Sequence, residues 1–315
     1  MKLARLAPLF LLLFAFAIYA VIAVVTDQTQ YLSFDNLLGL LGRAIALGIT
    51  AIGQTFAILV ASIDLSVANL ISVAAVLASY IMSGDPAMML PAVGVVLAVG
   101  AIVGLVNGLV ITKLEVNPLI ATLGMALILQ GVLSASFTNF AGEVPAEFQG
   151  FAYGEIGGVS ISLLFLLGLT VLAWAFLKFT RAGANIYSVG GNPDAAKLAG
   201  VRTTRVVVMA HVITSLCASV AGLYLASRLR SGAPWIGRDG VYDLESIAVV
   251  VIGGTALAGG RGGVWGTLVG VMIFSLIDSI FNISGVDAFA KQILRGVIIV
   301  AAVALYAARS QRIEA

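Results

Sequence analysis

Long apolar stretches recur from one end of this chain to the other, and they limit what it can fold into. Hydrophobic residues make up 61% of its 315 residues and charged residues only 10%, whereas a soluble domain uses about 25% charged residues. Lipid must therefore solvate much of the exterior. Because a helix needs about 20 apolar residues to cross a bilayer, the sequence predicts an all-α, polytopic transmembrane bundle of about ten spans. We expect one membrane domain, residues 1–315.

The polar segments between the apolar stretches are loop-sized, so none is expected to form a soluble domain. The eighth span is short and rich in glycine, and we expect it to be broken or to cross only part of the bilayer. The first span follows two basic residues as a signal peptide does, but its long apolar run predicts a retained helix. The predicted spans are Ala7–Val25, Arg43–Ala61, Val67–Met82, Met89–Ile111, Leu119–Thr138, Ser160–Phe179, Val206–Ala226, Ser246–Ala258, Gly263–Ile283 and Ala290–Ala308.

Basic residues in the loops predict that both termini are cytoplasmic, which requires an even number of spans. The segment Thr138–Ser160, placed outside, has three glutamates and no basic residue. The outer loop Arg228–Glu245 is an exception, since it carries three arginines. The basic residues assigned to the cytoplasmic side are Lys2, Arg5, Lys113, Lys178, Arg181, Lys197, Arg202, Arg205, Arg261, Arg309 and Arg312.

The composition excludes several chemistries. The single cysteine, Cys217, cannot form an internal disulfide, and the single histidine, His211, cannot supply a multi-histidine metal centre or the paired histidines of a metalloprotease. We interpret Cys217 as a packing residue and His211 as a packed or interfacial residue rather than a proton relay. The formal net charge of +2 gives no sign of a nucleic-acid partner. We predict no catalytic residue, no metal site and no bound cofactor.

Glycines inside the spans predict close helix packing, because small residues let helices approach one another in lipid. The pairs Gly100–Gly104, Gly104–Gly108 and Gly266–Gly270 each lie on one helix face.

A polar break, Ile63-Asp64-Leu65-Ser66-Val67, separates the second and third predicted spans. Asp64 or Ser66 can cap the following helix by accepting an otherwise unpaired amide hydrogen. Alternatively, the break lines a polar path, since irregular backbone is tolerated at membrane depth where it faces protein or water.

A glycine-rich segment, Gly253–Gly263, follows the eighth span and contains Gly253, Gly254, Gly259 and Gly260. No Gly-Lys-Ser/Thr follows, so it is not the phosphate loop of an ATPase. We predict a sharp helix break and re-entry, because glycine adopts positive φ at no steric cost.

The polar loop 180–205 carries a helix-start signature, Asn192-Pro193-Asp194. It combines a capping side chain, a proline in the first turn and an acid that the helix dipole favours, and Gly200 is a natural stop. We predict a short helix, Pro193–Ala199, whose small face docks a cytoplasmic partner; the alternative is a simple connecting loop. The predicted docking residues are Asn192, Pro193, Asp194, Ala195, Ala196, Ala199 and Gly200.

The chain resembles the permease subunits of bacterial ABC importers for sugars of the ribose/xylose/galactose type. Four stretches, spread over most of the chain, carry the resemblance: Ile63–Val67; Ala121–Gly124 with Gly131; Gly190–Ala196 with Gly200; and Ile247–Thr255 with Gly259–Gly262. The chain departs from the family pattern at Ala61-Ser62, Ala68 and Gln130, which could shift helix packing or substrate choice.

The resemblance implies a division of labour in the inner membrane. A periplasmic sugar-binding protein would deliver substrate, two permease subunits (identical or homologous) would form the pathway in the lipid bilayer, and a cytoplasmic ATPase would bind and hydrolyse ATP. The segment Asn192–Gly200 would be the coupling helix. Uncharged polar side chains suit a sugar, so the predicted pathway residues include Gln54, Asn107, Gln130 and Asn282. Asp278 is added because a carboxylate inside the membrane is costly and therefore suggests a function.

Each pathway residue also has a structural interpretation. The amides can serve as hydrogen bonds between helices, and Asp278 can simply be hydrated near the outer end of its span. Two other functions stay open. Related permeases transport branched-chain amino acids, nucleosides or other small polar solutes. A secondary transporter driven by protons or sodium would need several buried charges, and only Asp278 and Asp64 qualify.

Overall fold

The computed structural model describes the backbone of residues 2–314. It describes the side chains of residues 8–287, 289–301 and 304. The terminal basic residues used for the orientation therefore lie outside the described side chains. The described chain is helical apart from one small hairpin. Its elements are α1 (Lys2–Val25), η1 (Thr29–Leu32), α2 (Phe34–Arg43), α3 (Ile45–Leu59), α4 (Val67–Met82), η2 (Pro86–Met88), α5 (Met89–Lys113), α6 (Pro118–Ser136), α7 (Ala146–Tyr153), β1 (Glu155–Ile156), β2 (Val159–Ser160), α8 (Ile161–Phe179), α9 (Arg181–Gly191), α10 (Pro193–Leu198), α11 (Thr203–Leu229), α12 (Ile236–Asp239), α13 (Tyr242–Ile252), α14 (Val264–Ile283) and α15 (Ala288–Glu314).

Every predicted span overlaps a helix, but the helices differ in their capacity to cross a membrane. Among the described residues, six are long and apolar enough to do so, and α2 with α3, bent by 48°, makes a seventh if the pair is one span. The helix α4 has 16 residues and is shorter than a full span. The eighth predicted span, Ser246–Ala258, is broken as expected, because α13 ends at Ile252.

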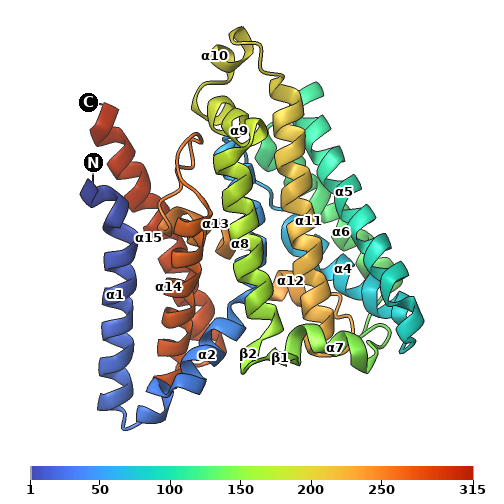
Figure 1. Cartoon of the computed structure of the whole chain (residues 1–315), viewed down its shortest axis with the longest axis vertical. Helices are drawn as coiled ribbons and strands as arrows, with labels where there is room; N and C mark the ends of the chain where they lie inside the picture. The colour runs from blue at the N-terminus through green and yellow to red at the C-terminus, as the bar shows by residue number, and fades with distance from the viewer. Residues whose placement is uncertain (1, 315) are drawn as a thin grey trace.

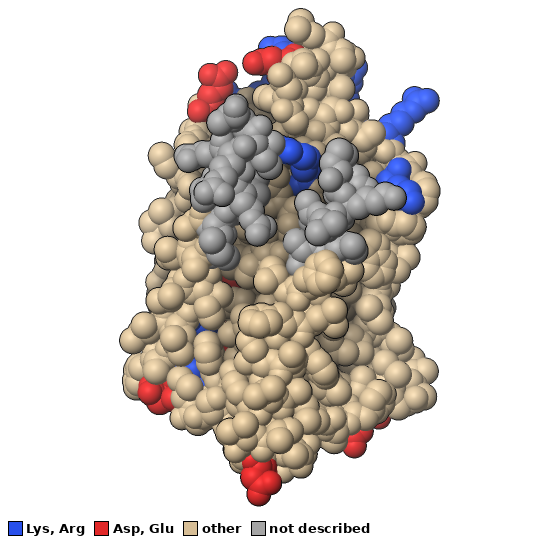
Figure 2. All heavy atoms as spheres, turned by 90° about the vertical axis from the view of Figure 1, so that its left-hand side faces the viewer, with Lys and Arg blue, Asp and Glu red and all other residues tan. Residues whose placement is uncertain are grey.

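The surface of the bundle matches a lipid environment. Figure 2 shows a broad band with few charged atoms between charged side chains at the two ends of the molecule. Large apolar side chains on the outer helices face outward, such as Leu13, Ile102, Leu127 and Leu172, each at least 58% exposed. In water such a surface would aggregate, so the chain is a membrane protein.

Helix α11 lies at the centre of the bundle and packs against α5, α3 and α4 (Figure 1). The predicted glycine face makes this contact on α5. A Cβ atom at Gly104 would lie 2.6 Å from the His211 carbonyl oxygen, and one at Gly108 would lie 2.6 Å from the Val208 Cα. On α14, Gly270 meets Val249 of α13 in the same way, and Gly266 meets Gly253, just after the end of α13. The predicted small-residue packing is therefore confirmed.

Two ends of the bundle can be distinguished in Figure 1. Helices α9 and α10 project at the upper end, on the same side as both chain termini. Helix α7 and the β1–β2 hairpin, whose register pairs Glu155 with Ser160, lie at the lower end. There, Ala141 and Gly232 exchange backbone hydrogen bonds and join two loops.

The sequence did not predict four of the described α-helices, α2, α7, α9 and α12. Helix α9 lies inside the loop 180–205 and begins where the Thr180 hydroxyl accepts the Gly183 N–H at 3.0 Å. The sequence did not predict α9 as a helix because it contains several glycines, and glycine is a poor helix former. Helix α7 lies inside the segment predicted as the polar loop Thr138–Ser160.

Candidate functional site

The polar break between α3 and α4 folds into a buried hydrogen-bonded network rather than a water-filled path. Asp64 is fully buried. Its Oδ1 accepts the Ser66 N–H at 2.9 Å and the Ser66 hydroxyl, and its Oδ2 lies 3.1 Å from the Nδ1 of His211. The other ring nitrogen of His211 lies 2.8 Å from the hydroxyl of Ser62. Ser66 begins the helix, but its side chain caps no helical N–H.

Two of the predicted pathway residues belong to this network. The Asn107 amide donates to the Ser66 hydroxyl at 3.0 Å and to Asp64 Oδ2 at 3.4 Å. With its amide oriented to satisfy both groups, Gln54 donates to the Asp64 carbonyl at 3.3 Å and accepts the Asp64 N–H at 3.2 Å. Both amides are buried, so in this conformation they hold helices together. His211 is a fully buried partner of Asp64.

The other predicted pathway residues lie elsewhere. Asp278 on α14 forms an ion pair with Arg295 on α15, and Asn282 accepts a hydrogen bond from Lys291. These contacts tie α15 to the bundle.

Gln130 lines a separate cavity of about 270 Å³ near the end of α6 that is distant from α10. This cavity combines uncharged polar side chains with one arginine and two aromatic rings, those of Phe137 and Trp235, a lining that suits a small polar ligand. Its other lining residues include Asn69, Ser134, Trp235 and Arg238, none of which the sequence analysis singled out. Trp235 and Arg238 lie in the short segment around α12, where no sequence pattern marks a site.

The short helix α10 forms as predicted, and it ends one residue earlier, at Leu198. The Asn192 side chain accepts the Ala195 N–H at 2.9 Å, and Gly200 has a φ of +83°. The predicted docking residues are exposed except for one. Ala196 is only 5% exposed and faces the protein, so it cannot contact a partner in this conformation. The sequence missed Leu198, which is 90% exposed.

The glycine-rich segment also forms the predicted break, between the end of α13 at Ile252 and the start of α14 at Val264. Its re-entry into the membrane stays a prediction. Gly254, Gly259, Gly260 and Gly262 all have positive φ. This segment reaches the end of α3, because the Gly260 N–H donates to the Leu59 carbonyl at 3.0 Å. It also touches α9, because a Cβ at Gly190 would lie 2.6 Å from the Gly260 nitrogen.

Helix α9 is held against this loop from a second side. The Tyr187 hydroxyl donates to the Gly262 carbonyl at 3.0 Å. Burial raises the pKa of Tyr187, so its hydroxyl stays protonated as this bond requires.

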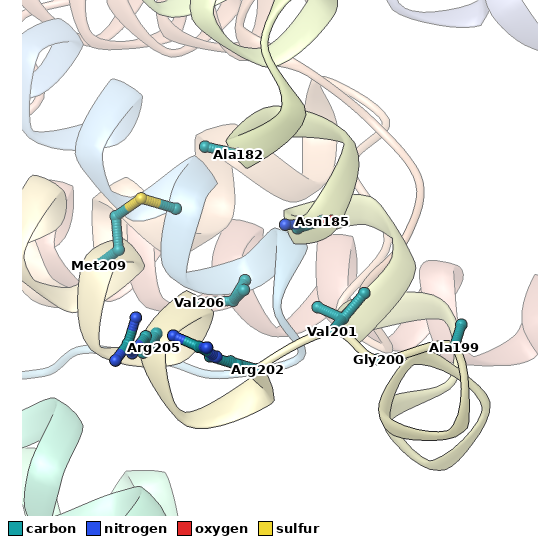
Figure 3. Close-up of a pocket in the computed structure, with 9 residues that line it drawn as sticks. All are labelled: Ala182, Asn185, Ala199, Gly200, Val201, Arg202, Arg205, Val206 and Met209. Carbon is teal, nitrogen blue, oxygen red and sulfur yellow. The ribbon is translucent and has the colours of Figure 1, made fainter.

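At the foot of α10, the segment 199–206 borders a cavity of about 410 Å³ against α9 (Figure 3). Arg202 and Arg205, at the start of α11, contribute its charge. Among the described residues, no group of three or more His, Cys, Asp or Glu side chains is arranged to hold a metal ion.

Six or more apolar helices with buried polar contacts between them define a multi-pass α-helical membrane protein. Residues 36–303 match the family described as "Branched-chain amino acid transport system / permease component". The chain belongs to this family, and it is a multi-pass protein of the inner membrane.

Curated relatives match nearly the whole chain. It is 36% identical over 294 residues to the ribose import permease protein RbsC of Escherichia coli K12, covering 91% of this chain and 90% of the relative. It is 35% identical to RbsC of Bacillus subtilis, covering 90% and 88%. It is 32% identical to the galactose/methyl galactoside import permease protein MglC of Salmonella typhimurium, covering 90% and 89%. No solved structure gives a significant match.

Proposed function

We propose that this chain is the membrane permease subunit of an ATP-binding-cassette importer for a pentose or hexose. The observation that carries the proposal is its similarity to ribose and galactose import permeases over about nine tenths of their length. The chain has no phosphate-binding loop, so in this proposal a separate cytoplasmic ATPase binds the ATP. A periplasmic binding protein delivers the sugar, and a second permease subunit completes the pathway. The chain itself has no catalytic residue.

The proposal includes a topology of ten spans with both termini cytoplasmic, in a single membrane domain. In Figure 1 both termini and α10 lie at one end of the molecule, and this arrangement supports the topology. The measurement is labelling of single cysteines by a membrane-impermeant maleimide in a Cys217→Ser background. Ala195→Cys should react only from the cytoplasmic side and Glu143→Cys only from the periplasmic side, whereas the reverse pattern would invert the topology.

Helix α10 is the proposed coupling helix, and Leu198 is its main contact. Leu198, the last residue of α10, is 90% exposed and is the large apolar side chain that this projecting helix can offer to a partner. Leu198→Asp should therefore lower ATPase recruitment and sugar uptake at least tenfold, because a charge would be buried in the docking cleft. Leu198→Met, of similar size and polarity, should retain both.

The matched control is Ala87→Glu, which adds a charge to an exposed residue of η2. Wild-type uptake by Leu198→Asp, in membranes with equal protein, would refute the coupling assignment and leave the sugar assignment intact.

The cavity around Gln130 is the proposed entry point for the sugar. Its amide and hydroxyl groups can hydrogen-bond a sugar, and Trp235 offers an apolar ring face. Uptake of radiolabelled ribose, xylose, galactose and leucine by cells that produce the whole transporter tests the substrate class. Uptake of leucine alone would favour the alternative function, a branched-chain amino acid permease, which the family description suggests.

A further inference from the structure

A groove runs along the bundle surface where the end of α5 meets the start of α11. Its volume is about 710 Å³. The wall within the membrane is apolar and comes from both helices, with Leu109 on α5 and Val208, Val212 and Ile213 on α11. Exposed apolar side chains alone would mark only contact with bulk lipid, so the groove's polar end decides what it binds.

Four cations gather at that polar end. Lys113, Lys197, Arg202 and Arg205 all line the groove and are exposed. In the part of the chain that the structure describes, none of these four lies within 4.0 Å of a carboxylate. The two arginines also line the neighbouring cavity of Figure 3. The groove therefore has a concentrated positive charge with no counter-ion among the described side chains.

The depth of these groups in the bilayer follows from the length of α11. Its 27 residues span about 40 Å, whereas the hydrocarbon core is about 30 Å thick, so its ends extend into the headgroup region. Arg202 and Arg205 are at such an end, and Lys113 is the last residue of α5. Val208 and Val212 lie one to three turns deeper. The groove therefore has cations at the depth of the lipid headgroups and an apolar wall at the depth of the acyl chains.

We propose that this groove binds an anionic phospholipid. The lipid phosphate contacts the four cations, and one acyl chain lies along Leu109, Val208 and Val212. Basic pockets between transmembrane helices on the cytoplasmic side bind acidic lipid headgroups in this way. The inference rests on the membrane placement of α5 and α11 and is independent of the transported solute. Because residues 201–205 line the groove, bound lipid would stabilise the junction between α10 and α11.

The experiment uses the full chain, purified in a neutral detergent. Native mass spectrometry counts retained lipid when micelles are doped with phosphatidylglycerol or phosphatidylcholine. Phosphatidylglycerol should bind preferentially and raise the unfolding temperature, and added salt should weaken it. Arg202→Gln and Arg205→Gln should each weaken binding about fivefold, the effect expected for one cation near a charged headgroup.

Lys113→Gln repeats the test at an exposed side chain that folding does not require, and Lys178→Gln is its matched control at the end of α8, outside the groove. Equal binding of the two lipids would overturn the proposal, as would a Lys113→Gln variant that binds like Lys178→Gln. Displacement by inorganic phosphate alone would indicate a phosphate site instead. If the arginine variants bound lipid like the wild type but no longer recruited the ATPase, the cations would be assigned to that partner and the proposal would fail.

Discussion

Two groups of ionisable side chains lie among the helices, and they differ in burial and in hydrogen bonding. The first centres on Asp64 and His211, which are both 0% exposed. The second joins Glu245, Asp278 and Arg295, of which the last two are 29% and 27% exposed. The first group sits at a break in the backbone, and the second joins three continuous helices.

Hydrogen bonding separates the two groups further. Both carboxylate oxygens of Asp64 and both ring nitrogens of His211 have partners. In the second group, Arg295 Nη1 lies 3.2 Å from Glu245 Oε1 without hydrogen-bond geometry, and Oε1 has no hydrogen-bond partner among the described residues. A fully paired buried network fixes one arrangement, whereas long, partly solvated side chains tolerate several. We infer that the first group fixes the break and the second attaches α15.

The largest effect is expected from Asp64→Ala. His211, Ser66 and Asn107 would lose their shared acceptor in a site closed to water, and breaking a buried pair costs about 3–5 kcal/mol. Thermal unfolding in detergent measures the loss. The control is Asp85→Ala, which removes an exposed carboxylate that caps η2, and equal losses in the two variants would mean that the buried network contributes no special stability.

The double variant Asp64→Ala with His211→Ala sharpens this test. Since the two residues interact directly, it should lose less than the sum of the single variants. Strict additivity would show that the pair carries no coupling energy.

Gly104→Ala should have an intermediate effect. The added methyl would lie 2.6 Å from the His211 carbonyl oxygen, so α5 and α11 must separate at the level of the network. Such overpacking costs about 1–3 kcal/mol. Gly94→Ala, on the same helix with nothing within 4 Å of its new methyl, should be neutral or slightly stabilising. Equal melting of both variants would contradict the close packing.

Arg295→Gln should have the smallest effect, a loss of about 1 kcal/mol, because its hydrogen-bonded pair with Asp278 is partly exposed and such pairs contribute little. Hydrogen exchange should rise in α15 and stay unchanged in α11. Arg238→Gln, which removes an exposed pair with Asp239, is the control. A loss as large as that of Asp64→Ala would remove the distinction between the two groups.

The sequence predicted the elements that depend on local chemistry. Asn192, Pro193 and Gly200 define α10 through a cap, a fixed φ and a positive φ, and the structure agrees. The glycine faces on α5 and α14 were predictable because their spacing alone places them on one side of a helix.

Contacts between distant segments could not be predicted in the same way. Asp64 and His211 are 147 residues apart, and nothing in either neighbourhood indicates the other. The inward direction of Ala196 depends on how α10 packs, and a run of alanines does not specify it. The sequence does not predict the exposure of Leu198 for the same reason, since leucine is usually a buried residue.

One backbone contact at the base of α9 limits how the upper end of the molecule can move. A Cβ at Gly190 would lie 1.8 Å from the Leu59 carbonyl oxygen and 2.6 Å from the Gly260 nitrogen. Three chain segments thus touch through main-chain atoms, with no side chain between them to rotate and absorb a displacement. A shift of α9 toward these atoms, even one smaller than a methyl group, must therefore displace the end of α3 or the 253–263 loop as well. The three segments must then move together.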